Sequence, residues 1–462
     1  MFLQENQAIK AENHLMEPSD KEHTQLEIPI SLINLLRFAS PAIIMMLFIA
    51  SYTIVDGIFV ANYLGTEALA AVNIVFPFSS IIFSLAIMLS TGGSALVGIK
   101  LGSKAELQAK QYFTLLLVSA AGAGICLSAG ALIFREQILS FLGAEGATLA
   151  YAQTFFTITA SFAPVVILQI LFENFFITIG KARVALGLTI VAGLVNAALD
   201  YLFLAVWGWG IEGAALATAA GSFFPVAYAL YYFTNQQQLL AFVKPIWEWA
   251  IIKQACFNGS SEMISQLSGG IIALLFNIIL LKLFGIAGVA AVSIVLYSEF
   301  LVLAIYSGFS MGIAPLLSYN YGGKERLKIK KLVRLALGIV LLLSSGIYVL
   351  LNFFTGNIVA LFVPINSEVY ILAKQGLTIF AVGYILAGVN IFAAAMFTAF
   401  GNGRISAILA ILRTFVFIVL GLYVWPKIIS GIGVWLAVPC AELLTIIFTI
   451  YYLQTNRKRY SY

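Results

Sequence analysis

The stretch YLGTEALAAVNIV, Tyr63–Val75, is matched 220 residues later by LFGIAGVAAVSIV, Leu283–Val295. The same offset pairs Gly92 with Gly312. An offset held over most of each half, with almost no gaps, is not expected by chance. The sequence therefore predicts a fold built from two similar halves, a design common among membrane proteins with internal repeats.

The composition excludes a soluble protein. Of the 462 residues, 61% are hydrophobic and 10% are charged, and the mean hydropathy is +1.01. Soluble globular domains carry about 25% charged residues. The three cysteines are isolated in apolar runs, and both histidines lie in the polar N-terminal tail, so no metal or cofactor site is indicated. We predict a polytopic membrane protein without a bound cofactor.

Twelve stretches are apolar and long enough, at about 20 residues, to cross a bilayer as helices, which predicts an all-α fold. They lie at 32–60, 68–98, 112–134, 150–178, 184–206, 212–234, 252–283, 288–317, 332–354, 369–398, 405–425 and 431–453. Each half holds six, and since six is even, both halves enter from the same side as parallel repeats. We expect a polar tail (1–30), a first lobe (31–234), a linker (235–251), a second lobe (252–453) and a basic tail (454–462).

Lysine and arginine residues gather on one side of the predicted membrane. Of the 25 in the chain, 20 lie in the tails, near the start of the first span or in connections after even-numbered spans. Short basic loops favour the cytoplasmic side. The sequence thus predicts a multi-pass protein of the cytoplasmic (inner) membrane with both termini in the cytoplasm. The net charge of +5 is then a topology signal, and no nucleic-acid partner is expected.

Six carboxyl side chains fall within predicted spans, where an ionised group costs about 2.5–3.5 kcal/mol on insertion scales. They are Asp56, Glu173, Asp200, Glu262, Glu299 and Glu442. Each is a candidate functional residue unless it faces a wet cavity, stays protonated or neutralises a structural cation. Glu173 is about two turns from Lys181, which places it near the cytoplasmic mouth.

Asp56, in the apolar run IASYTIVDGIFV, is the strongest candidate. Tyr52 precedes it by one helical turn and shares its face. In the fifth span Asn196 and Asp200 share a face by the same spacing, and the sixth span offers Thr218. Such oxygen donors bind H+ or Na+, so the first lobe is predicted to hold a coupling-ion site.

The second lobe lacks counterparts of both aspartates and has charged residues of its own. Glu262 and Gln266 share a face of the seventh span, and Glu299 lies within the eighth. We expect Glu262 or Glu299 to contact a substrate cation. Arg413 and Glu442, in the last two spans, form either a structural ion pair or a part of the transport path, and their positions in the sequence leave both open.

The motifs LRFASPAIIMM, from Leu36, and VDGIFVANYLGTEALAAVN, from Val55, together with the GKAR and GNGR turns at 180–183 and 401–404, resemble the multidrug and toxic compound extrusion (MATE) family. The resemblance extends from about Leu32 to Leu453 and depends on the order and spacing of the motifs. It implies a V-shaped, two-lobed antiporter that exports organic cations in exchange for H+ or Na+.

The resemblance also implies roles for single residues. One branch of the family has an Asp fifteen residues after the first-helix proline, as Asp56 follows Pro41, with an Asn-x-x-x-Asp in the fifth helix and a Thr in the sixth. Gln169 stands where the family often has Asn. A bend at Pro41 is expected to move Asp56 on protonation. With Tyr52 added, the predicted coupling-ion site is Tyr52, Asp56, Gln169, Asn196, Asp200 and Thr218.

The function predicted is a secondary antiporter that exports cationic, amphipathic drugs or toxins, with small organic cations and membrane lipids as partners and a monomeric chain. The rivals are a lipid-linked precursor flippase and a dedicated metabolite exporter of the same superfamily. A flippase cavity should offer Lys or Arg to a pyrophosphate, whereas the charges within these spans are mostly acidic. An intramembrane enzyme would need a nucleophile–base pair or metal ligands, and a non-transporting scaffold would tolerate loss of the Asp56 charge.

Overall fold

The computed structural model describes residues 25–462, except for the side chains of residues 54–62, 66 and 147. Every regular element within this range is helical. The N-lobe comprises α3 (Leu32–Gly102), α4 (Glu106–Ile133), α5 (Arg135–Phe141), α6 (Ala147–Thr178), α7 (Ala182–Asp200), the π-helix η1 (Tyr201–Val206) and α8 (Ile211–Thr234). The C-lobe comprises α9 (Trp249–Gly322), α10 (Arg326–Ala360), α11 (Glu368–Ala399), α12 (Gly403–Ile411), the π-helix η2 (Leu412–Val416), α13 (Phe417–Ile429), the 3-10 helix η3 (Ser430–Leu436) and α14 (Ala437–Tyr460).

The first helix of each lobe is a pair of helices joined at a glycine. In α3 the break is at Gly65 (φ 81°, ψ −174°), and in α9 it is at Gly285 (φ 61°, ψ −150°). Both residues adopt a positive φ that glycine reaches without steric cost. They are the pair that the 220-residue offset aligns, so the internal repeat is present in the backbone as well as in the sequence.

The end of each second span shows the same correspondence. Lys104 and Lys324 both have positive φ, at 58° and 55°. Each donates its backbone N–H to a carbonyl three residues earlier, on Leu101 and Tyr321, to close the turn. The turns that precede the fifth helix of each lobe likewise pair a positive-φ Gly180 with Gly401.

The helix lengths support twelve crossings. Ten stretches of the described chain are long and apolar enough to span a membrane. Two of them, 249–322 and 403–460, have 74 and 58 residues, far more than the roughly 20 that one crossing needs. The first breaks at Gly285, and the second changes to a 3-10 helix at Ser430. Counting each as two gives the predicted twelve spans.

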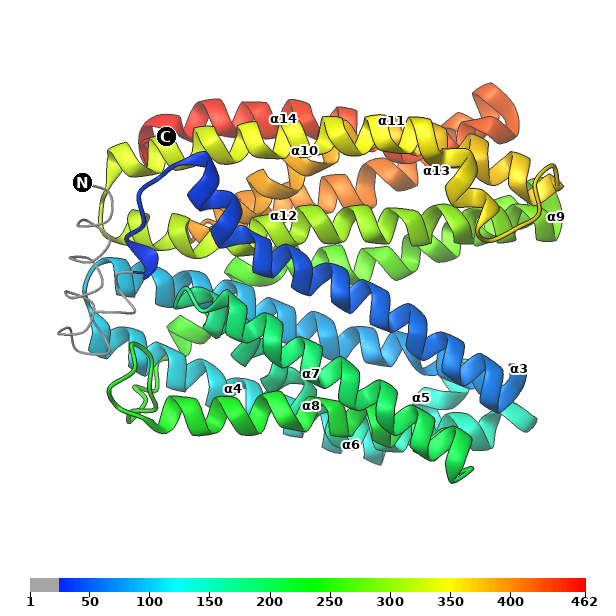
Figure 1. Ribbon diagram of the computed structural model, residues 1–462, viewed down its shortest axis with the longest axis horizontal. Coiled ribbons are helices and arrows are strands. Elements are labelled where there is room, and N and C mark those ends of the chain that lie inside the picture. The colour runs from blue at the N-terminus through cyan, green and yellow to red at the C-terminus, as the bar shows by residue number, and fades with distance from the viewer. Residues whose placement is uncertain (1–24) are drawn as a thin grey trace, which may run out of the picture.

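The two lobes join at the end of the molecule that holds both the start of α3 and the C-terminus (Figure 1). We call this the basic end, because most of the described Lys and Arg residues lie there. A Cβ built on Gly259 of α9 would lie 1.9 Å from the carbonyl oxygen of Met88 in α3, and one on Gly102 would lie 1.8 Å from that of Tyr319. The glycines therefore allow the α3 and α9 backbones to touch directly.

The buried hydrophobic residues form two large cores that reflect how the lobes join. One core runs through the N-lobe and continues at the basic end into the C-lobe, where it includes Phe309 and Phe397. A second core, around Phe276, Phe380 and Trp435, belongs to the far half of the C-lobe alone. The lobes are thus packed together at the basic end, and they separate toward the far end (Figure 1). The all-α, two-lobed fold predicted from the sequence is confirmed.

Candidate functional site

The N-lobe site lies where α7 gives way to η1. Asp200 is the last residue of α7 and is 0% exposed, and Asn196 one turn earlier is 5% exposed. The six residues after Asp200 form a π-helix. Such wide turns are rare and are frequently found at functional sites. A buried carboxyl group at the edge of a π-helix is therefore a candidate for ion binding.

The sixth span completes this part of the site. The Asn196 amide donates to the Thr218 hydroxyl at 3.3 Å, which joins α7 to α8. The two helices approach closely because α8 has Gly221 at the crossing, where a Cβ would lie 2.8 Å from the carbonyl oxygen of Ala192. Small residues at a helix crossing permit this contact.

Tyr52 reaches the site from α3. Its ring lies over α7, since a Cβ on Gly193 would lie 3.6 Å from Tyr52 Cδ1 and 2.6 Å from the Phe48 ring. Gly193 is one turn before Asn196. The structure thus brings α3, α7 and α8 together at this point. They carry four of the six residues predicted for the coupling-ion site: Tyr52, Asn196, Asp200 and Thr218. The Asp56 side chain lies outside the described residues, although its backbone continues α3 one turn beyond Tyr52.

Gln169, the sixth residue of the predicted set, lies in a different polar contact. Its amide donates to the Glu173 carboxylate at 3.0 Å, one turn further along α6. Glu173 is 5% exposed. The next residue, Asn174, donates to the Ser90 hydroxyl at 3.1 Å and connects α6 to α3. The N-lobe therefore holds a second buried carboxyl group, Glu173, with Gln169 as its hydrogen-bond partner.

The C-lobe has an ion pair inside its helices. The Arg413 guanidinium donates to one oxygen of Glu442 at 3.0 Å. The other oxygen accepts from the Asn390 amide at 2.7 Å, and Asn390 also donates to the Glu442 carbonyl at 3.1 Å. Thr449 in turn donates to the Asn390 side-chain oxygen at 2.7 Å. Sequence reasoning missed Asn390 and Thr449, although both are polar residues within apolar runs.

Arg413 belongs to η2, so the fifth helix of each lobe carries a π-helix next to a charged residue. Its charge also acts on Glu262 and Glu299 of α9, which are half-buried. Gln266, predicted to share a face with Glu262, is exposed. Arg413 therefore has one carboxylate in direct contact, Glu442, and two further acidic residues, Glu262 and Glu299, close enough to interact with its charge.

Two helical lobes, a polar cluster within each and an internal repeat define a polytopic membrane transporter rather than an enzyme. The MatE family model matches residues 41–202 and 260–424, which is most of both lobes. The chain belongs to the MatE family of transporters, the multidrug and toxic compound extrusion family.

Relatives and solved structures agree with this assignment. The multidrug export protein MepA of Staphylococcus haemolyticus is 24% identical over 403 residues, which covers 85% of this chain and 87% of MepA. An outward-facing multidrug resistance transporter of the MATE family superimposes with a TM-score of 0.86 at 22% identity, covering 92% of this chain and 96% of the other. A transporter of the MOP superfamily from Pyrococcus furiosus also gives a TM-score of 0.86, at 21% identity, and covers 97% of each chain.

Proposed function

We propose that the protein is a secondary antiporter that exports cationic, amphipathic compounds in exchange for H+ or Na+. The observation that carries the proposal is the fully buried Asp200 at the α7–η1 junction, one turn from Asn196 and its partner Thr218. An ionised carboxyl group is costly inside a span, and binding a proton or Na+ removes that cost. A site of this kind has an affinity for ions that depends on how the surrounding helices are arranged.

Coupling follows if ion and cargo favour different arrangements of the lobes. The ion neutralises Asp200, whereas a cationic cargo requires a negative partner. Tyr52 links the ion site to α3, and α3 also carries the glycine contacts with the C-lobe. Ion binding at Asp200 can therefore alter the packing of α3, and through α3 the join between the lobes.

The cargo class is proposed from charge and from the relatives. MepA is named a multidrug export protein. In the C-lobe, Glu262 and Glu299 are half-buried acids near a single arginine, an arrangement that favours a cation over an anion. Arg413 is already held by Glu442 at 3.0 Å, which argues against a pyrophosphate-binding flippase at this position.

We further propose that the basic end faces the cytoplasm, so that the protein lies in the cytoplasmic membrane with both termini inside. The excess of Lys and Arg in the short connections at this end supports the orientation. With the lobes packed together at the basic end, the structure then corresponds to the state open toward the outside. We also propose that the chain works as a monomer.

The test is ethidium efflux from cells that lack their own pumps, at equal membrane abundance of each variant. Wild type, Asp200→Asn and Asp56→Asn are compared with the proton gradient intact, with it collapsed, and with Na+ varied. Glu368→Gln, an exposed acid at the start of α11, is the matched control. We expect gradient-dependent efflux in wild type and control and its loss in Asp200→Asn. Normal efflux by Asp200→Asn would remove the basis of the proposal.

A further inference from the structure

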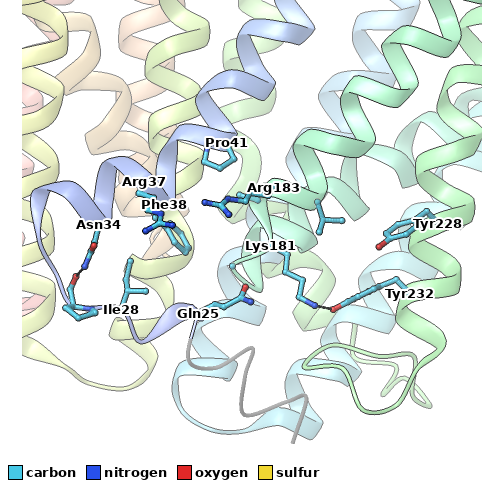
Figure 2. A pocket seen from close by; sticks show the side chains of 14 residues that line it. Gln25, Ile28, Asn34, Arg37, Phe38, Pro41, Lys181, Arg183, Tyr228 and Tyr232 are labelled. Carbon is cyan, nitrogen blue, oxygen red and sulfur yellow. Dashed lines mark hydrogen bonds between the residues drawn. The ribbon is translucent and has the colours of Figure 1, made fainter. Parts of the chain in front are cut away.

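A pocket of about 660 Å³ opens at the basic end between the start of α3, the start of α7 and the end of α8 (Figure 2). Its volume lies within the roughly 300–1,000 Å³ typical of small-molecule sites. The pocket is remote in the chain from the Asp200 cluster, which lies at the other end of α7. No step of the proposed transport cycle uses it.

The pocket is strongly basic. Arg37 of α3, Lys181 before α7 and Arg183 of α7 line it, and within residues 25–462 none of the lining residues is acidic. Figure 2 shows both guanidinium groups in the space between α3 and α7. Lys181 is held in place, since it donates to the Tyr232 hydroxyl and its ammonium lies 4.6 Å from the Tyr232 ring centre. A cavity lined by three cations favours an anion, and Arg and Lys side chains bind phosphate groups well.

The internal repeat shows that this pocket is particular to the N-lobe. The GKAR turn that supplies Lys181 and Arg183 corresponds to GNGR in the C-lobe, where Asn402 replaces the lysine. Asn402 donates to the Tyr460 hydroxyl at 2.8 Å. The start of α12 packs against α9 so closely that a Cβ on Gly403 would lie 2.5 Å from Cα of Asn258. The equivalent place in the C-lobe is thus filled by backbone.

The surroundings point to a lipid as the source of the phosphate. The pocket wall also includes the apolar side chains of Ile28, Phe38 and Val184. On the first turns of α3, Ile33 is 74% exposed and other large apolar side chains are exposed beside Arg37. An exposed apolar surface next to a basic cavity, at the end of a spanning helix, matches the place of a phospholipid headgroup at the membrane boundary.

We propose that this pocket binds the phosphate headgroup of an anionic phospholipid, with Arg37 and Arg183 as its ligands and Lys181 fixed by Tyr232 as a third cation. The site ties the starts of α3 and α7 together through the bound headgroup. The proposal does not depend on the coupling ion or on the cargo.

The experiment uses the purified full-length protein in detergent micelles that contain equal amounts of phosphatidylglycerol and phosphatidylcholine with the same acyl chains. Native mass spectrometry then counts the lipids bound to each protein. We expect wild type to retain one phosphatidylglycerol in preference to phosphatidylcholine. The double variant Arg37→Gln with Arg183→Gln should bind it about tenfold or more weakly, because each basic residue contributes to attraction of the headgroup.

The control is Arg404→Gln, which removes the exposed arginine at the repeat-equivalent position of Arg183 and lies outside the pocket. It should bind phosphatidylglycerol as wild type does, and Arg183→Lys should keep most of the affinity. Equal binding of both lipids by wild type would overturn the proposal, as would equal weakening by Arg404→Gln. Inorganic phosphate or glycerol 3-phosphate, added alone to wild type, should compete poorly; displacement of the lipid at similar concentrations would overturn the lipid assignment.

Discussion

The Arg413–Glu442 ion pair stabilises the C-lobe, so replacing one of its two residues should lower the free energy of unfolding by a measurable amount. Glu442→Leu deletes the acceptor of two hydrogen bonds, from Arg413 at 3.0 Å and from Asn390 at 2.7 Å. The side chains of Arg413 and Glu442 are 15% and 5% exposed. Breaking a buried ion pair on one side costs about 3–5 kcal/mol, because a charge is left unpaired.

Two features reduce that cost here. Arg413 retains some contact with solvent, and the carboxyl groups of Glu262 and Glu299 still attract it. We therefore expect Glu442→Leu to lower the free energy of unfolding by about 2–4 kcal/mol. Arg413→Met should cost a similar amount. Combining the two replaces the pair by apolar groups, which is often nearly neutral, so the double variant should lie within about 2 kcal/mol of wild type.

Equilibrium unfolding in mixed micelles titrated with a denaturing detergent gives all four free energies, and we expect the double-mutant cycle to give a coupling of at least about 2 kcal/mol. Ethidium efflux is measured on the same variants. Because Arg413 and Glu442 neutralise each other within the C-lobe, we expect the pair to be structural and the double variant to export normally. A coupling near zero would refute the reasoning on stability. A stable double variant without efflux would assign the pair to the transport path.

Two further predictions concern glycine contacts. Gly259→Ala should lower the apparent melting temperature, since its Cβ would lie 1.9 Å from a backbone oxygen of α3 at the join of the lobes. Gly338→Ala on α10, where a Cβ meets nothing within 4 Å, is the control and should leave the melting temperature unchanged. Equal melting temperatures of the two variants would argue against a tight join of the lobes. Gly193→Ala should reduce gradient-dependent efflux several-fold at unchanged abundance, because its Cβ would displace the Phe48 and Tyr52 rings. Gly187→Ala on the same helix, with open space around it, is the control. Unchanged efflux by Gly193→Ala would show that Tyr52 is not part of the ion site.

Much of the backbone could be predicted from the sequence. The offset that aligns Gly65 with Gly285 places the break in α3 and the break in α9. Hydropathy predicts twelve spans because a bilayer imposes one length on every helix. The four-residue spacing of Asn196 and Asp200 also predicts one face of α7, and Thr218, predicted from the sixth span, accepts a hydrogen bond from Asn196 in the structure.

The rest depends on contacts between distant segments. The family resemblance placed Gln169 at the ion site, whereas in the structure its amide donates to Glu173, a carboxyl group that the sequence analysis named separately. The π-helix η2 has no signature in its five residues. Arg37 and Arg183 both belong to the basic end by the charge rule, but only the packing of α3 against α7 places them in one pocket.

The fifth helix shows how the two repeats have acquired different chemistry on one scaffold. In each lobe this helix contains a π-helix, and in each a charged residue lies at or within it: Asp200 beside η1 and Arg413 in η2. The signs are opposite. The C-lobe has its own cation, which the carboxylate of Glu442 already neutralises, whereas the ligand that we propose for Asp200 is an ion from outside the chain. Exchange of an ion with the surroundings is therefore expected at the N-lobe, while the C-lobe pair keeps its charges balanced through the cycle.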